Sequence, residues 1–209
     1  MAMLKADKRA AQAAETRDAL LAAARDLFGQ QGYAATSTEE IVERAGVTKG
    51  ALYHHFSDKL SLFKAVFEQV QLEVSDAAVA EFNQPDSWAA LIAGCRLWVD
   101  AHADPAVRQI LLVDARGVLG WEVAREIETR FSTVALRGAL RKAMHSGVVT
   151  RQPLRPLAVM LIGALSEACF YIAANPDSPD TRTEVADLIV TLLGAFRAAA
   201  VVPPARKHA

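Results

Sequence analysis

Residues 36–63 read TSTEEIVERAGVTKGALYHHFSDKLSLF, and the start of this stretch holds two candidate helix caps. A hydroxyl residue followed three positions later by Glu has the spacing of a capping box. Thr36 with Glu39 satisfies this spacing. Ser37 with Glu40 also satisfies it, and we favour Ser37 as the cap. A short helix is therefore expected to begin directly after Ser37.

The end of this helix and the start of the next are marked by Gly46 and Thr48. Gly46 stops the first helix after about two turns, because a glycine lets the chain reverse in a left-handed turn. Thr48 then caps a second helix, which is expected to end near His55. Two short helices joined by such a turn predict a helix-turn-helix unit, whose second helix usually enters the major groove of DNA.

The second helix has one face that is a poor candidate for protein core. Projected at about 100° per residue, that face is polar and carries Gly50 where a helix former would be expected. Gly50 weakens the helix by about 1 kcal/mol relative to alanine, and close approach of a DNA backbone would explain it. The hydroxyl and free N–H groups at Thr48 suit a phosphate, and the other side chains offer donors to phosphates or base edges. This pattern places at DNA the residues Thr48, Lys49, Gly50, Tyr53, His54 and, from the next helix, Lys59.

Residues 16–70 carry a longer series of such features in a fixed order. The segments are Ala23-Ala24-Arg25-Asp26-Leu27-Phe28, Gly32-Tyr33, Thr36-Ser37-Thr38, Ile41, Ala45-Gly46-Val47-Thr48-Lys49-Gly50, Leu52-Tyr53-His54-His55-Phe56 and Lys59-Leu60-Ser61-Leu62-Phe63. Together they resemble the DNA-binding domain of the tetracycline-repressor (TetR) family. The resemblance implies a transcriptional regulator, and it adds Thr36 and Ser37 to the residues that approach DNA, mainly through phosphates. Thr38 and Leu60 depart from the family pattern at positions that bear on local packing.

Helical patterning continues through the rest of the chain, and strand-like alternation is absent. We predict an all-α fold of about nine helices. A three-helix helix-turn-helix domain is expected over residues 14–60, a helical ligand-binding and dimerisation domain over residues 61–202, and flexible tails at 1–13 and 203–209. Gly29 and Gly32 are expected to end the first helix. The expected helices outside residues 36–56 cover about 15–31, 58–82, 87–102, 105–113, 120–145, 154–174 and 182–200.

The composition narrows the class of protein. Apolar residues make up 52% of the 209 residues and charged residues 22%, which is typical of a globular chain. The net charge is −1, and residues 1–60 hold eight basic and eight acidic side chains, so DNA contact must depend on placement. Cys95 and Cys169 are interpreted as buried thiols in a reducing cytoplasm. We expect no signal peptide and, without a run of about 18 apolar residues, no membrane span.

Motifs of catalysis and metal binding are also missing. The sequence contains no HExxH, GxSxG or GKS/T motif and no glycine-rich phosphate loop after a strand. Apart from the adjacent His54 and His55, the histidines do not fall at the spacing of metal ligands. We therefore expect no enzyme activity, no cofactor and no metal site.

A homodimer is predicted from the two C-terminal helices. Residues 154–174 are apolar nearly all round, so this helix must be buried on more than one side. Residues 182–200 supply a second apolar helix. We predict that the two helices pair with their copies in a four-helix bundle, as the family resemblance also implies. Such a dimer would separate its reading helices by about one DNA turn or more, so the operator should be close to palindromic.

An effector pocket is predicted from one face of the helix over 87–102. Leu91, Cys95, Trp98 and His102 share that face by their spacing. The face is either core with a terminal histidine or the wall of a small-molecule site. Glu167 is either a buried interface anchor or a ligand partner. The residues predicted to bind the effector are Cys95, Trp98, His102, Asp114, Trp121, Phe131, Met160, Glu167 and Phe170.

The predicted function is a ligand-responsive repressor that binds double-stranded operator DNA as a dimer and is released by a small apolar or amphipathic molecule. The ligand would shift the helix that starts near Lys59 and so change the spacing of the reading helices. The alternatives are a regulator that needs its ligand as a corepressor, and an activator. The rivals from other classes are an interaction protein that does not bind DNA, and a small helical enzyme. The presence of Thr48, Lys49, Gly50 and Tyr53 argues against the first.

Overall fold

The computed structural model describes residues 2–175, 178 and 180–198 of the chain. Every named secondary-structure element in those ranges is a helix. An isolated β-bridge joins Val149 to Arg197, so the all-α prediction is confirmed. The helices are α1 (Ala2–Ala35), α2 (Thr38–Ala45), α3 (Lys49–His55), α4 (Lys59–Phe82), α5 (Ser87–Ala103), α6 (Pro105–Arg108), α7 (Ala115–Leu119), α8 (Trp121–Glu128), α9 (Val134–His145), α10 (Leu154–Ala174) and α11 (Thr181–Gly194), with π-helical segments η1 (Gln109–Asp114) and η2 (Thr129–Thr133).

Two of these runs are continuous helices interrupted by π-helical turns. α6, η1 and α7 form one run, and α8, η2 and α9 form the next, with Gly120 between them at a φ of 79°. Counted this way, the described residues hold the nine helices that the sequence predicts. The first run is longer than predicted: the sequence predicts a helix over residues 105–113, and the observed run continues to Leu119.

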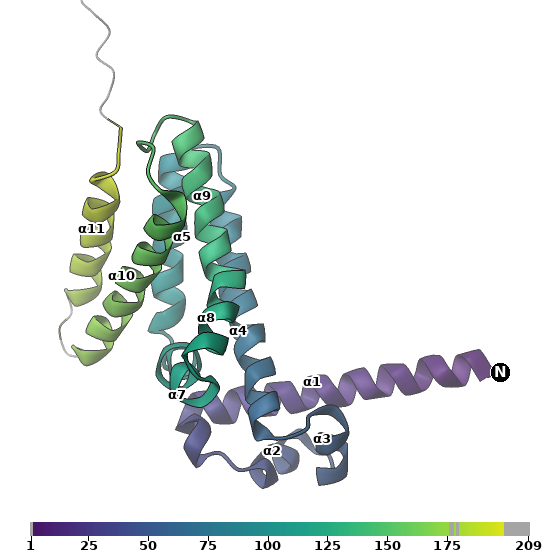
Figure 1. The fold of residues 1–209 in the computed structure, drawn as a ribbon. Coiled ribbons are helices and arrows are strands. Elements are labelled where there is room, and N and C mark those ends of the chain that lie inside the picture. Colours follow the sequence, from purple (N-terminus) through teal and green to yellow (C-terminus); the bar gives the residue numbers. More distant parts are fainter. Residues whose placement is uncertain (1, 176–177, 179, 199–209) are drawn as a thin grey trace, which may run out of the picture.

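Helix α1 differs most from the prediction. It begins at Ala2, so residues 2–13, expected to be a loose arm, are helical, and in Figure 1 this part projects away from the other helices. Gly29 does not end the helix. It lets α6 approach, because a Cβ at position 29 would lie 2.6 Å from the Cβ of Ala106. Gly32 does interrupt the helix, with φ 80° and ψ 165°. Met1, residues 199–200 of the last expected helix and the expected tail at 203–209 lie outside the described residues.

The N-terminal helices share one core with the C-terminal bundle. Phe28 of α1, Ile41 of α2 and Leu52 of α3 are fully buried in one core cluster that also includes Leu62 and Phe63 of α4. Figure 1 shows α2 and α3 below α1, with α4 rising from them into the bundle. Helix α4 therefore connects the helix-turn-helix unit to the C-terminal domain, with a buried face that runs from Leu62 to Phe82.

Helix α5 is the centre of the C-terminal bundle. It packs against α4, α9, α10 and α11, and Figure 1 shows α10 and α11 on one side of the bundle. Helix α10 is long and apolar enough to cross a membrane by length and composition, which the sequence analysis did not expect. The helix packs against α5, α9 and α11, and a core helix of a soluble protein would pass the same test of length and composition.

Candidate nucleic-acid interface and effector cavity

The helix-turn-helix backbone forms through the caps that the sequence predicts. The Ser37 side chain accepts the Glu40 N–H at 3.2 Å, and the Glu40 carboxylate accepts the Ser37 N–H at 2.7 Å. Gly46 adopts the left-handed conformation, with φ 66° and ψ 30°. The Thr48 hydroxyl then accepts the Ala51 N–H at 3.2 Å. The prediction of Ser37 as the cap is confirmed.

One face of α3 is open to solvent while the other completes the core. Leu52 and Phe56 are buried, whereas the Tyr53 side chain is 48% exposed. His55 is half-buried. The residues of the predicted reading face that are exposed are Thr48, Lys49, Gly50, Tyr53 and His54.

Gly50 has no structural reason to be a glycine within the described protein. Its backbone is helical, and a Cβ at this position would meet only the Thr48 Oγ1, at 3.8 Å. Gly46 is different, because its left-handed φ favours glycine directly. The lack of a side chain at position 50 therefore leaves the outer surface of α3 flat without easing any contact inside the molecule.

Lys49 is paired with Glu39 across the two helices. Its ammonium group contacts the Glu39 carboxylate, and both side chains are more than half exposed. The hydrogen bond from Lys49 lowers the pKa of Glu39 to about 2, and the pKa of Lys49 is raised by the same contact. Because the pair is exposed and screened by solvent, Lys49 is free to exchange Glu39 for another anion.

Thr36 and Lys59, both predicted to approach DNA, have other roles in the structure. Thr36 is 2% exposed, and its hydroxyl donates to the Gly32 carbonyl at 2.8 Å, so its side chain is almost entirely buried. The Lys59 ammonium donates to the carbonyls of Tyr33 at 2.9 Å and Thr36 at 2.8 Å. Both residues shape the connection between α1 and α2. With half-buried Ser37 and exposed Tyr53 they line a shallow depression of about 500 Å³.

The predicted effector face encloses only a small cavity, of about 10 Å³, between α4, α5, η2, α9 and α10. Cys95 and Trp98 line it, as predicted. Burial raises the pKa of the Cys95 thiol to about 12, so this group is neutral. Sequence reasoning missed the other lining residues, although the small Ser75 and Ala78 interrupt the large apolar residues of α4. Those other residues are Ser75, Ala78, Phe82, Gly94, Ser132, Ala135, Leu136, Ile162 and Leu165.

His102, also predicted to bind the effector, does not line this cavity; it lies one turn beyond Trp98 and stacks on it. The ring centroids are 3.8 Å apart, and His102 Nδ1 lies 2.7 Å from the Trp98 carbonyl oxygen. Within the described part of the chain, Trp98 Nε1 and His102 Nε2 are buried and have no hydrogen-bond partner. Burial lowers the pKa of His102 to about 4, so the imidazole is neutral near pH 7.

The other predicted effector residues lie away from this cavity. Asp114 accepts the Tyr33 N–H at 2.8 Å and so joins η1 to α1. Trp121 is 58% exposed beside Arg116 and Arg125. Phe131 and Phe170 are half-buried against the core without lining the cavity. Met160 is 71% exposed and Glu167 is exposed, because this face of α10 points out of the subunit.

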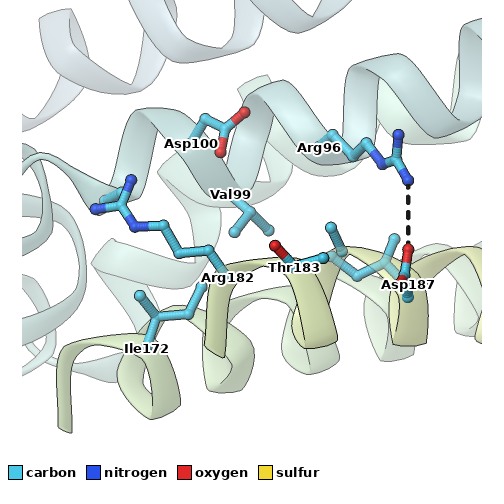
Figure 2. A pocket seen from close by; sticks show the side chains of 10 residues that line it. Arg96, Val99, Asp100, Ile172, Arg182, Thr183 and Asp187 are labelled. Carbon is cyan, nitrogen blue, oxygen red and sulfur yellow. Dashed lines mark ion pairs between the residues drawn. The ribbon is translucent and has the colours of Figure 1, made fainter. Parts of the chain in front are cut away.

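A wider groove lies between α5 and α11, with a volume of about 320 Å³. Figure 2 shows Arg96 facing Asp187 across the groove, at 4.0 Å, and Asp100 and Arg182 toward its other end. Charges of both signs alternate along this open groove, and its apolar floor includes Val99. None of the predicted effector residues lines it. In the described ranges, no cluster of three or more His, Cys, Asp or Glu side chains could hold a metal ion.

Comparisons with known proteins match both halves of this chain. The family model described as "Bacterial regulatory proteins, tetR family" matches residues 20–66, and "Tetracyclin repressor-like, C-terminal domain" matches residues 88–196. The TetC protein of transposon Tn10 from Escherichia coli is 29% identical over 130 residues, which are 62% of this chain and 66% of that protein. The regulator AcrR of Shigella flexneri is 44% identical over 71 residues, which are 34% of this chain and 33% of AcrR. The matches thus span about a third to two thirds of these curated relatives.

A solved structure of a TetR-family transcriptional regulator from Pectobacterium atrosepticum is similar over nearly its whole length. It is 32% identical to this chain, with a TM-score of 0.76. The likeness covers 90% of this chain and 97% of that one.

Proposed function

This chain belongs to the TetR family of bacterial transcriptional regulators, and we propose that it is a cytoplasmic repressor that binds a near-palindromic operator as a homodimer and is released by a small molecule. The observation that carries the DNA-binding part is the exposed face of α3, on which Gly50 eases no contact within the protein. A DNA backbone that approaches α3 closely would use this flat surface. Ser37, Thr48, Lys49, Tyr53 and His54 surround it with donors to phosphates and bases.

The ion pair between Lys49 and Glu39 makes a prediction about operator affinity. In Glu39→Gln, Lys49 loses its intramolecular partner, and a carboxylate that repels phosphate is removed from the reading surface. We expect operator binding to tighten about two- to fivefold, as measured by fluorescence anisotropy at constant salt. Glu43→Gln, an equal change in charge on the same helix, is the control and should have a smaller effect. Equal effects of the two substitutions would show that Lys49 does not exchange its partner for DNA.

The proposed dimer uses the outward faces of the last two described helices. These faces carry large exposed apolar side chains, which a monomer would leave in water. A second copy related by a two-fold axis would cover them in a four-helix bundle. The exposed side chains are Met160 (71%) and Tyr171 (53%) on α10, and Leu188 (66%) and Leu192 (39%) on α11.

Leu188→Glu should disrupt this dimer. The substitution places a carboxylate in the centre of the proposed apolar interface, where burial of an unpaired charge is unfavourable. We expect sedimentation velocity at micromolar concentration to show a monomer, and operator binding to weaken with it. Val134→Glu, at a residue that is 49% exposed on α9, should remain dimeric. A Leu188→Glu protein that sediments as a dimer would place the interface elsewhere.

Release by an effector is proposed through α4. This helix begins at Lys59, which is bonded to the connection between α1 and α2, and its far end lines the cavity with Ser75, Ala78 and Phe82. An effector that changes operator occupancy about tenfold must prefer one arrangement of α4 by about 1.4 kcal/mol. The same route would serve a corepressor, and operator titrations with and without the effector distinguish the two polarities.

A further inference from the structure

Three buried side-chain polar atoms of the C-terminal domain lack partners within the described residues, and two of them lie on adjoining rings, whereas the third is Nε of half-buried Arg137 on α9. Trp98 Nε1 and His102 Nε2 are both buried, with Trp98 6% exposed and His102 1% exposed. Buried polar atoms in native proteins are nearly always paired with protein or water, so two orphans on adjoining rings call for a partner outside the chain. Of the two residues, Trp98 lines the cavity and His102 does not, but the His102 ring stacks on Trp98 with 3.8 Å between the ring centroids, so a partner in the cavity lies next to both rings.

The hydrogen bond at His102 Nδ1 fixes what each orphan requires. Its partner, the Trp98 carbonyl oxygen, can only accept, so Nδ1 carries the proton. In a neutral imidazole Nε2 is then a bare acceptor, whereas the indole Nε1–H of Trp98 is a donor. The interior therefore offers one unused donor and one unused acceptor on stacked rings. A hydroxyl group is the smallest group that satisfies both, because it accepts and donates at one atom.

The lining of the cavity limits the rest of the molecule. The lining consists of apolar, small or hydroxyl-bearing side chains and includes no charged residue, so a charged occupant would be buried without a counterion. The Ser132 hydroxyl already donates to Gln71 Oε1 at 2.9 Å. The cavity itself has room for about one water molecule, so a larger occupant must displace a side chain. Phe82 is suited to move, because it is the last residue of α4 and its ring fills the space over Gly94.

We propose that the effector is a small, neutral, largely apolar molecule with a hydroxyl group, whose oxygen accepts from Trp98 Nε1–H and whose hydrogen is donated to His102 Nε2. The proposal rests on the proposed function, in which the C-terminal domain binds an effector. The apolar part of the molecule would take the place of the Phe82 ring. Binding would thereby act directly on the end of α4.

Three probes of similar size test this assignment. Phenol supplies both a donor and an acceptor, anisole supplies only an acceptor, and toluene supplies neither. In the full-length protein labelled with ¹⁵N, we expect phenol to shift the indole N–H resonance of Trp98 downfield while those of Trp88 and Trp121 stay in place. Calorimetry should rank phenol over anisole over toluene, with about five- to tenfold between phenol and toluene.

Two separate substitutions are used, so that the test does not depend on one variant protein folding correctly. Trp98→Phe and His102→Phe each remove one orphan atom, and each should bring phenol to within about twofold of toluene. Trp88→Phe, at a half-buried residue outside the cavity, should leave the ranking unchanged. Equal binding of the three probes, or a Trp98 resonance that no probe moves, would show that an ordered water satisfies the two atoms and would overturn the proposal. Operator binding without probe is measured separately, so failure here leaves the DNA-binding proposal standing.

Discussion

A Gly50→Ala protein is expected to be more stable than the wild type and yet to bind operator DNA about five- to a hundredfold more weakly. The gain in stability follows from helix propensity, about 1 kcal/mol, because a Cβ at position 50 meets nothing closer than 3.8 Å within the described protein. The loss in binding follows from a methyl group forced between α3 and the DNA. Overpacking of a close interface typically costs about 1–3 kcal/mol. Because stability is expected to rise while operator affinity falls, a loss of DNA contact can be distinguished from a loss of folding.

Thermal unfolding and fluorescence anisotropy measure the two effects on the same preparations. Gly138→Ala is the matched control, because Gly138 lies within α9 and a Cβ added there would have no neighbour within 4 Å in the described protein. It should gain similar stability and bind operator like the wild type. A Gly50→Ala protein that binds as tightly as the wild type would mean that DNA does not approach this face of α3.

Asp114→Ala is expected to weaken the connection between the two domains. The Asp114 carboxylate of η1 accepts the Tyr33 N–H at 2.8 Å, directly after the interruption of α1 at Gly32. The Tyr33 carbonyl in turn accepts from Lys59, whose ammonium also lies 4.1 Å from the Tyr33 ring centroid. Removal of the carboxylate leaves the part-buried Tyr33 N–H unpaired, which lowers the free energy of unfolding by about 1–3 kcal/mol. The response of operator binding to effector should fall as well.

Urea denaturation and operator titrations with and without effector check this expectation. Asp114→Asn retains an oxygen that can accept the Tyr33 N–H, so it should retain most of the stability and of the response. Asp100→Ala removes an exposed carboxylate from α5 and should behave like the wild type. An Asp114→Ala protein with unchanged stability and full response would show that the bond between η1 and α1 does not couple the domains.

The helix-turn-helix unit could be predicted closely because its signals are local. A capping box at Ser37, a left-handed glycine at Gly46 and a hydroxyl cap at Thr48 each act within one turn of helix. The prediction that Gly29 ends a helix was wrong, because this glycine serves a tertiary contact. It ends nothing and instead admits Ala106 of α6. Thr36 faces inward for the same kind of reason, since its hydroxyl bonds the Gly32 carbonyl at the interruption of α1.

The cavity lined by Cys95 and Trp98 could be predicted only along α5. The helical spacing of Cys95 and Trp98 holds within that one regular helix. Phe131 lies in the π-helical segment η2, where the extra residue per turn shifts later side chains from their expected face. Asp114 was expected beside the break after residue 113, but it lies in η1 and accepts the Tyr33 N–H. The prediction that Met160 and Glu167 face the cavity was wrong for a different reason. A helix as apolar as α10 does not reveal which side faces the core and which faces out.

Selection of genomic DNA fragments by the full-length protein tests the central claim most directly. We predict enrichment of a near-palindromic site with half-sites about one DNA turn or more apart, and loss of that enrichment in Tyr53→Ala, which removes an exposed side chain of the reading face. The enriched site would also identify the regulated genes. Absence of an enriched site, or equal enrichment by Tyr53→Ala, would contradict the proposal that α3 reads an operator.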